Sequence, residues 1–349
     1  MVARAKFAVG LGLALASAGA GSALQAQEAS VPAVTSVGEW RPEAKYHAGE
    51  PQPVEVRLRD GVILTGMVAY PVDKSTGERA TGTFPVILEF TPYIRLPIYY
   101  VPYGYIALRV NQRGTHQSGG DYIGWTARGG ADGADVVNWA AKLEGSNGKV
   151  GMVGCSAAGF TQLATAAAVG PNSPLKAIIP SDSGGDQLRE TYLSNGVPNT
   201  TAGWPPRYLI RMLGNTPSVY NALTDGSRAS VLRGGEWAYD SPGLYRDRPN
   251  MDDVVRNVAD NGIATLVWTN FRGMNQNGAF SFISSLQNAS AQGTAGDGIF
   301  GPPAAGQKVD SRYQLVANGG HRPRARERRA DRIWGSCPDG PFRRLSRTH

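Results

Sequence analysis

The chain is poor in the residues that cross-link proteins or bind metals, with two cysteines and four histidines in 349 residues. Two cysteines cannot build the disulfide framework of a small secreted scaffold, so the fold has to depend on a hydrophobic core. We expect Cys155 to be a buried, inert thiol with no disulfide to Cys337. Cysteine, histidine and acidic residues are nowhere grouped as in a metal site, and no glycine-rich stretch has the context of a nucleotide-binding loop. We therefore expect no metal and no cofactor.

The chain also lacks a long hydrophobic run, apart from its first residues. Residues 1–26 combine a basic start at Arg4 and Lys6, a short apolar stretch and a series of small residues ending at Ala26. This composition is typical of a secretory signal peptide, and the apolar stretch is too short to span a membrane. We expect a periplasmic or secreted protein with no membrane span after cleavage of the signal.

Most of the chain has no excess of basic residues, although the formal net charge of the whole chain is +7. Residues 322–349 contain nine arginines and three acidic residues, so this Arg-rich tail accounts for nearly all of the excess. The remainder is close to neutral, which disfavours a basic surface for nucleic acid spread over the fold. We expect no nucleic-acid partner.

Short apolar stretches typical of strands alternate with helical patterns along the chain. This order predicts an α/β fold with a mostly parallel, doubly wound sheet. Near the start, two alternating stretches, 54–58 and 62–68, flank Asp60-Gly61 and predict an antiparallel hairpin. The further predicted strands are 84–90, 105–110, 149–155, 175–180, 263–268 and 313–316, and the predicted helices are 132–144 with Asp132 as its cap, 157–169 and 280–286.

The most informative stretch is Gly154-Cys155-Ser156-Ala157-Ala158-Gly159, which lies between a predicted strand and an alanine-rich helix. A serine at such a corner is typical of the nucleophile elbow of α/β-hydrolases, where small neighbouring residues permit a tight turn. The usual Gly-x-Ser-x-Gly pattern has a glycine in the place of Ala158, and here the glycine follows one residue later. The alternative is an ordinary Gly/Ser-rich turn of an α/β protein.

An activated serine requires a base, and the base requires a third group that orients it. In the α/β-hydrolase order, the histidine follows both the serine and the acid. His47 precedes the predicted fold, His116 lies in a loop after a strand, and His349 is the last residue. His321 follows the last predicted strand, and we therefore expect it to be the base.

Several short motifs between residues 50 and 321 occur in a fixed order and spacing. They are Arg59-Asp60-Gly61, Thr91-Pro92-Tyr93, Gly104-Tyr105, Arg113-Gly114, Ser118-Gly119-Gly120, residues 146–152 and Leu188-Arg189-Glu190-Thr191-Tyr192. In these motifs the chain resembles the cocaine-esterase-like and X-Pro dipeptidyl-peptidase-like serine acyl hydrolases. The resemblance implies an α/β-hydrolase domain, a helical cap and a C-terminal jelly-roll domain.

The resemblance also implies roles for individual residues. Ser156 corresponds to the nucleophile and His321 to the base. Tyr93 matches a tyrosine whose hydroxyl supplies one half of the oxyanion hole, and the Ala157 N–H supplies the other half. One such donor contributes on the order of 3 kcal/mol to the stability of the transition state. The alternative for Tyr93 is an ordinary place in the aromatic run of residues 99–105.

The acid of the triad departs from the family pattern. The family has a Trp-x-Asp sequence after the strand before the last, whereas this chain has Trp268-Thr269-Asn270. Asn270 can orient the histidine through its carbonyl, although an amide in place of the acid lowers kcat roughly 10⁴-fold in a serine protease. Asp182, after the preceding strand, is an equal candidate, and Asp297 and Asp310 are weaker ones.

The resemblance ends at His321, and residues 322–349 are too few for a jelly-roll domain. We expect these residues to be the aberrant end of a longer gene, and the alternative is a native basic tail that binds an acidic surface. The predicted organisation is a signal peptide (1–26), an extended lead-in (27–50), an α/β-hydrolase domain (51–183 and 259–321), a helical cap (184–258) and a disordered or aberrant tail (322–349).

Together these observations predict a secreted serine hydrolase that cleaves an ester or amide bond through an acyl-enzyme on Ser156. The expected substrate is a small-molecule ester or amide, or a peptide, and esterase or acylase activity is favoured. The alternatives are an X-Pro dipeptidyl-peptidase-type aminopeptidase, a truncated and catalytically inactive hydrolase-fold protein, and a protein that binds nucleic acid or an anionic surface through its basic tail.

Overall fold

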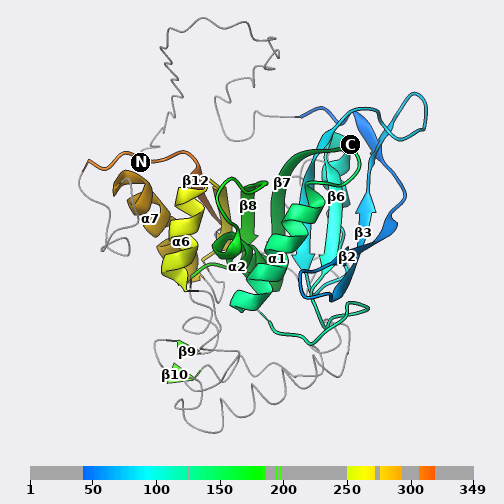
Figure 1. The fold of residues 1–349 in the computed structure, drawn as a ribbon. Coiled ribbons are helices and arrows are strands. Elements are labelled where there is room, and N and C mark those ends of the chain that lie inside the picture. Colours follow the sequence, from blue (N-terminus) through cyan, green and yellow to red (C-terminus); the bar gives the residue numbers. More distant parts are fainter. Residues whose placement is uncertain are drawn as a thin grey trace, which may run out of the picture. The chain divides into compact units, whose positions relative to one another are not determined.

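A computed structural model describes residues 42–124, 126–185, 193–194, 197–198, 250–271, 276–292 and 306–318. Its centre is an eight-stranded sheet with the strand order β12-β11-β8-β7-β5-β6-β3-β2 (Figure 1). The strands are β2 (Gln52–Arg57), β3 (Ile63–Ala69), β5 (Phe84–Thr91), β6 (Ile106–Asn111), β7 (Ser146–Cys155), β8 (Leu175–Ser181), β11 (Ala264–Asn270) and β12 (Tyr313–Asn318).

The strand pairing confirms the predicted sheet. The hairpin of β2 and β3 is antiparallel, β3 pairs antiparallel with β6, and every pair from β6 to β12 is parallel. Asp60 and Gly61 lie in the hairpin turn, where Gly61 has a φ of 87° and its N–H donates to the Leu58 carbonyl. Each predicted strand of the sheet is therefore present, with ends that differ by a few residues.

Four helices cover one face of the sheet. They are α1 (Ala127–Ala140), α2 (Ala157–Ala168), α6 (Met251–Asp260) and α7 (Gln276–Gln292). Helices α1, α2 and α6 lie side by side in Figure 1. The described cover of the opposite face is the short 3₁₀ helix η1 (Ile98–Tyr103), whose Val101 packs with Ala69 and Ala107 in a separate small core.

Helices lie on both faces because successive strands are added first toward one edge of the sheet and then toward the other. The connection from β5 to β6 runs toward one edge through η1, and the connection from β6 to β7 crosses back over β5 through α1. Parallel crossovers are right-handed, so a reversal of direction places the connecting helices on opposite faces. The sheet is therefore doubly wound, and its switch point lies between the carboxyl ends of β5 and β7.

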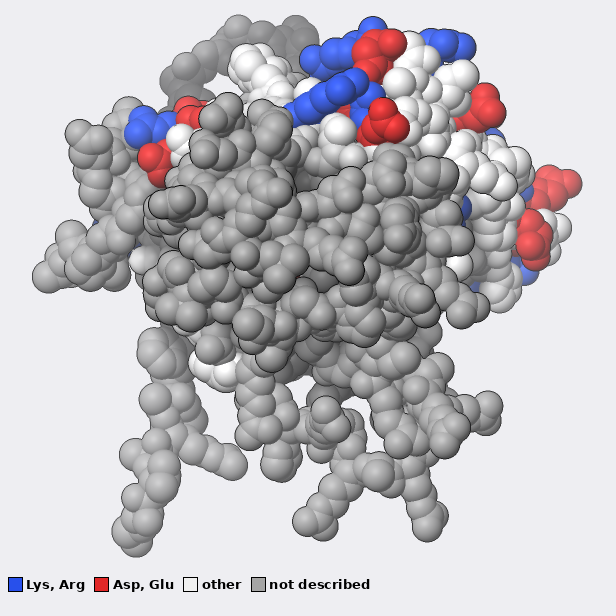
Figure 2. Space-filling model, turned by 90° about the horizontal axis from the view of Figure 1, so that it is seen from below, with Lys and Arg blue, Asp and Glu red and all other residues white. Residues whose placement is uncertain are grey.

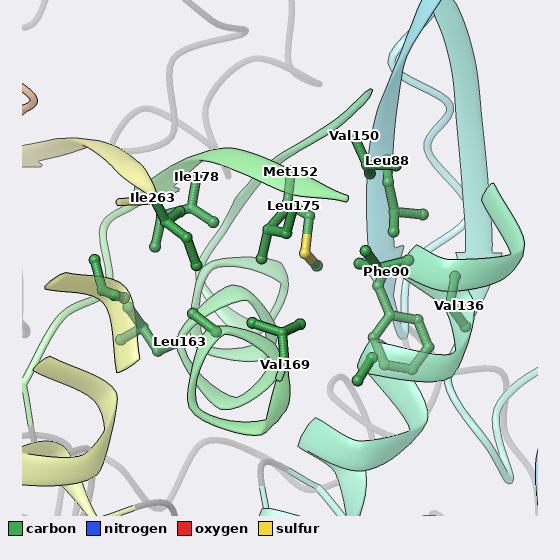
Figure 3. Packing of buried hydrophobic residues seen from close by; sticks show 14 of the residues in the cluster. Leu88, Phe90, Val136, Val150, Met152, Leu163, Val169, Leu175, Ile178 and Ile263 are labelled. Carbon is green, nitrogen blue, oxygen red and sulfur yellow. The ribbon is translucent and has the colours of Figure 1, made fainter. Parts of the chain in front are cut away.

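The main hydrophobic core lies between the sheet and the four helices. Figure 3 shows Phe90 of β5 between α1 and α2, with Met152 of β7 and Leu163 of α2 farther along the same layer. All three side chains are buried. Full burial of a side chain of this size contributes about 1.5–3 kcal/mol, so this layer fixes α2 on the strands that carry the corner at Ser156.

An ion-pair network, buried at Arg113 and Asp132, joins the hairpin turn, the loop after β6 and helix α1. The Arg113 guanidinium is 3 % exposed and donates to both carboxylate oxygens of Asp132, at 2.6 and 2.7 Å, and to Asp60 at 2.8 Å. The pKa of the Asp60 carboxyl is lowered to about 2, chiefly by its hydrogen bond from Arg113. Because these groups come from three segments, the network fixes the loop after β6 against both neighbours.

The prediction that Asp132 caps a helix was wrong. Helix α1 begins five residues earlier, and Thr126 caps it by accepting a hydrogen bond from the Gly129 N–H at 3.1 Å. Asp132 lies inside the helix because Arg113 holds its carboxylate there. The local sequence indicates a cap equally well at both positions, and the distant arginine decides between them.

Three short features differ from the predicted organisation. Strand β1 (Tyr46–Ala48), within the predicted lead-in, pairs antiparallel with β4 (Pro71–Asp73). Helix α6 begins inside the predicted cap, yet its buried Val254, Val255 and Val258 belong to the main core. Two short strands, β9 (Leu193–Ser194) and β10 (Val197–Pro198), form an antiparallel pair. The predicted signal peptide, the Arg-rich tail and the rest of the cap lie outside the described residues.

The described surface carries charges of both signs. On the face shown in Figure 2, basic and acidic side chains lie next to one another rather than in separate patches. Within the described ranges, no helix combines the length and the apolar character needed to cross a membrane.

A buried acid lies on the η1 face of the sheet. Glu89 of β5 is 5 % exposed and is paired in register with Arg109 of β6. Burial raises the pKa of the Glu89 carboxyl to about 8, although the charges of Arg95 and Arg109 lower it. The native protein therefore keeps a proton on Glu89 at pH values where the unfolded chain has lost it.

This shift predicts a pH dependence of stability. Between about pH 5 and 8 the native state binds more protons than the unfolded state, so the free energy of unfolding falls as pH rises, by up to about 1.4 kcal/mol per pH unit. The variant Glu89→Gln is expected to remove this slope in urea unfolding measured across that range. The exposed Glu55→Gln of β2 is the control and should leave the slope unchanged. Equal slopes for the wild type and Glu89→Gln would contradict the assignment.

Candidate active site

The predicted site residues that the structure describes lie at one edge of the sheet. Ser156 follows β7, Asp182 follows β8, Asn270 is the last residue of β11, and Tyr93 is two residues beyond β5. Because these strands are parallel, their carboxyl ends meet at the same edge. Ser156 and Tyr93 flank the switch point between β7 and β5, where ligands of open α/β sheets bind.

The backbone at Ser156 adopts a conformation that side chains rarely allow. Its φ is 58° and its ψ is −119°, directly before the first residue of α2. The Ser156 N–H donates to the Ser181 carbonyl at 2.9 Å, and the Ser156 carbonyl accepts from Gly159 at 2.8 Å and Phe160 at 3.0 Å. A non-glycine residue in such a region costs about 1–3 kcal/mol and persists where the surroundings enforce it, as at the nucleophile elbow.

Two glycines leave the space that the corner requires. A Cβ atom on Gly154, whose φ is 147°, would lie 2.5 Å from the Ala158 Cβ. A Cβ atom on Gly159 would lie 1.8 Å from the Ser183 Oγ and 2.7 Å from the Ser183 Cβ. The departure from the usual pattern thus has a physical explanation, since the close approach of the helix to β8 occurs at Gly159 and Ala158 still fits.

Two polar side chains of α2 attach the helix to the strands on either side of the corner. The Thr161 Oγ1 donates to the Phe90 carbonyl of β5 at 2.6 Å. The Gln162 Oε1 accepts from the Ile179 N–H of β8 at 2.8 Å, and its Nε2 donates to the Ala158 carbonyl at 2.9 Å. Both side chains are buried. Sequence reasoning missed them, although two polar residues in an otherwise apolar helix segment are a usable signal.

Tyr93 is held through its backbone. Its N–H donates to the Thr91 Oγ1 at 3.1 Å, and its carbonyl accepts from the Asn111 Nδ2 at 2.7 Å. Asn111 is the last residue of β6 and is buried. The hydrogen bond from Thr161 to the Phe90 carbonyl connects α2 directly to the end of β5. The segments that carry Tyr93 and the Ala157 N–H, the two predicted oxyanion donors, are therefore joined to each other.

The candidate acids occupy different places in the structure. Asp182 is 9 % exposed, has a φ of 48°, and donates its N–H to the Trp268 carbonyl at 2.7 Å. It directly follows β8, the strand beside β7, whereas Asn270 is paired in register with Asn318 of β12. Asp310 precedes β12, so it lies at the opposite edge of the sheet from Ser156, and it forms an ion pair with Arg312 at 2.6 Å.

Several predicted features lie outside the described residues or differ from expectation. His321 and Asp297 are outside the described ranges, as is the side chain of Asn270.

Cys155 is half-buried and disulfide-bonded, and its partner lies outside the described residues. The expectation of a buried free thiol was therefore wrong, because the side chain at this corner is not enclosed. Among the described residues, no group of three or more histidines, cysteines and acids could hold a metal ion.

The match to a known family covers Tyr93, the Ser156 corner and Asp182, and it ends before β11 and Asn270. Residues 60–229 match the model of the X-Pro dipeptidyl-peptidase family. Cocaine esterase from Rhodococcus sp. (strain MB1 Bresler) is 30% identical over 154 residues, which are 41% of this chain and 25% of the esterase.

Solved structures show the same fold. A CocE/NonD family hydrolase from Staphylococcus aureus is similar over 72% of this chain and 44% of its own, with a TM-score of 0.51 and 20% identity. An α-amino acid ester hydrolase is similar over 76% of this chain and 50% of its own, with a TM-score of 0.51 and 16% identity. At these identities the likeness establishes the fold alone.

The fold and the strand-to-helix corner define an α/β-hydrolase domain. Over residues 60–229 the chain is similar to the X-Pro dipeptidyl-peptidase family, and over 154 residues it is similar to cocaine esterase, so the resemblance predicted from the short motifs is confirmed. The chain spans one quarter of cocaine esterase and about half of these two solved structures.

The close contact at Gly159 gives a test of the corner. The variant Gly159→Ala places a methyl group against Ser183 and is expected to lower the free energy of unfolding by about 1–3 kcal/mol, the usual cost of overpacking. The control is Gly170→Ala, because a Cβ at that position meets nothing within 4 Å. Urea unfolding measures both variants. Equal stability of the two would show that the helix does not approach β8 closely at this point.

Proposed function

We propose that this chain is a serine acyl hydrolase that cleaves ester or amide bonds through an acyl-enzyme on Ser156. The observation that carries the proposal is the left-handed corner at Ser156, placed beside the end of β5 and its Tyr93. This corner presents a serine at the carboxyl edge of a doubly wound sheet, at its switch point. An ordinary βα turn has no need for the strained backbone that Ser156 adopts.

In the proposed reaction His321 takes the proton of the Ser156 hydroxyl, and the Ser156 Oγ attacks the substrate carbonyl carbon. The negative charge that develops on the carbonyl oxygen is stabilised by the Tyr93 hydroxyl and the Ala157 N–H. Ala157 is the first residue of α2, where backbone N–H groups and the helix dipole favour negative charge. The leaving group departs with the proton from His321, and water then releases the acyl group by the reverse sequence.

The orienting acid is proposed to be Asp182. Its strand is the direct neighbour of β7, and its carboxylate is largely removed from water. Asn270 remains the second candidate because it pairs with the strand that leads toward His321, but its amide carries no charge to stabilise an imidazolium.

Esterase or acylase activity on a small-molecule ester or amide is the favoured activity, and the similarity to cocaine esterase supports it. The family model favours a second candidate, the release of X-Pro dipeptides from a peptide amino terminus. A periplasmic or secreted location follows from the predicted signal peptide and is part of the proposal. The substitution of an amide at Asn270 motivates a third candidate, an inactive hydrolase-fold protein.

The proposal is tested with a fluorescent fluorophosphonate and a p-nitrophenyl ester. Folded wild-type protein is expected to be labelled and to hydrolyse the ester, whereas Ser156→Ala should do neither. Tyr93→Phe should lower kcat about 10²–10³-fold with little change in KM, because its hydroxyl acts on the transition state. The matched control is Tyr105→Phe, a tyrosine whose ring packs against Tyr100. A folded wild-type protein without labelling would establish the inactive alternative.

A pair of variants distinguishes the two candidate acids. Asp182→Asn is expected to lower kcat about 10⁴-fold, as for the corresponding change in a serine protease. Asn270→Asp should then have a small effect. The opposite result, in which Asp182→Asn leaves kcat unchanged and Asn270→Asp raises kcat strongly, would assign the role of the acid to residue 270. The dependence of kcat on pH is measured for each variant, since the acid stabilises the charged form of the histidine.

A further inference from the structure

A second histidine near the site is not used by the proposed reaction. His116 lies in the loop after β6 and has a φ of 51°, a left-handed conformation that a non-glycine residue rarely adopts. The loop is held at its base, since the Thr115 Oγ1 donates to the Gln112 carbonyl at 2.7 Å and the Ser118 Oγ to the Asn111 carbonyl at 3.0 Å. The strained backbone at His116 is thus supported by buried hydrogen bonds on both sides of it.

The ring of His116 reaches across to the segment that carries Tyr93. Its Nε2 lies 2.8 Å from the Pro92 carbonyl oxygen. A carbonyl oxygen only accepts hydrogen bonds, so the Nε2 atom must carry the proton and donate. This nitrogen is therefore occupied by the bond to Pro92 and cannot itself take the proton of Ser156.

With this bond, the carbonyls of Thr91, Pro92 and Tyr93 each accept a hydrogen bond from β6 or from the loop that follows it. The Thr91 carbonyl accepts from the Gln112 N–H at 3.1 Å, the Pro92 carbonyl accepts from His116, and the Tyr93 carbonyl accepts from Asn111. Proline at 92 has no N–H of its own, so its carbonyl is the one backbone hydrogen-bonding group that this residue contributes. The bond from His116 occupies it.

We propose that His116 is a positioning residue, which fixes the Pro92-Tyr93 peptide through its Nε2–H and so holds the Tyr93 hydroxyl where the oxyanion forms. The inference rests on the proposed function, because it assigns His116 a role in the same site. An oxyanion donor is effective only at hydrogen-bond distance from the developing charge, and a displacement of about 1 Å can cost 10²-fold in rate. The left-handed backbone of His116 is the strain that this placement requires.

The expected consequence is a loss of kcat without a loss of substrate binding. His116→Leu removes the donor and is expected to lower kcat about 10- to 100-fold with KM unchanged. His116→Gln retains an N–H donor at the end of a side chain and is expected to restore most of kcat. Leucine and glutamine carry a similar penalty at positive φ, so the two variants form a matched pair. Rates are expressed per site labelled by fluorophosphonate, which removes any effect of unfolded protein.

A double-mutant cycle with Tyr93→Phe tests whether His116 acts through Tyr93. If it does, His116→Leu has little further effect on kcat once the Tyr93 hydroxyl is gone. An equal loss in both backgrounds, or a failure of His116→Gln to restore the rate, would overturn the proposal and leave His116 with a structural role only.

A readout independent of activity separates this inference from the proposed function. With 3-fluorotyrosine at position 93, the fluorine resonance should be a single line in the wild type and in His116→Gln, and should shift or split in His116→Leu. If Ser156 of folded protein is not labelled but this pattern is seen, the proposed function fails while the positioning of Tyr93 stands. If the resonance is the same in all three proteins, His116 does not position Tyr93.

Discussion

The constraint on which the site depends is the close approach of α2 to β7 and β8 at the corner. The chain has to turn from strand to helix within one residue, and Ser156 takes the left-handed conformation that this turn demands. The turn is feasible because the neighbouring positions lack bulk, with Gly154 against Ala158 and Gly159 against Ser183. The burial of the α2 side chains in the main core offsets the strain at Ser156. The packing of α2 therefore both stabilises the core and holds Ser156 at the corner.

The second half of the site is attached to this corner rather than built separately. The hydrogen bond from Thr161 to Phe90 joins α2 to β5, and the bonds from Asn111 and His116 join the end of β5 to β6 and its loop. In turn, the ion pair of Arg113 with Asp132 fixes that loop to α1. Four elements that are distant in sequence therefore determine the separation between Ser156 and Tyr93, and each connection is a buried or partly buried polar contact with a defined direction.

The sequence predicts the parts of this arrangement that local rules govern. The strands of the sheet follow from apolar periodicity, and the Ser156 corner follows from the run of small residues between a strand and a helix. Contacts between distant residues are not encoded in any local window, so the ion pair that keeps Asp132 inside α1 and the bond from His116 to Pro92 were not predicted. The choice between Asp182 and Asn270 could not be made for the same reason, because it depends on which strands are neighbours. The Gly-x-Ser-x-Gly pattern expects a glycine at 158, where this chain has alanine. The structure explains the difference, because the close contact that requires a glycine lies at 159.

The strand order has a consequence for the order in which the molecule folds. Strands β5 and β7 are neighbours in the sheet, yet β6 and α1 lie between them in the chain. Their parallel pairing closes a long loop, and such non-local contacts form slowly compared with the hairpin of β2 and β3. Tyr93 with its supporting bonds from β6 can therefore be in place before the serine corner arrives. Ser156 and Tyr93 come together only when β7 inserts beside β5, so a chain that stops short of this step has the proposed oxyanion donor in place without the proposed nucleophile beside it.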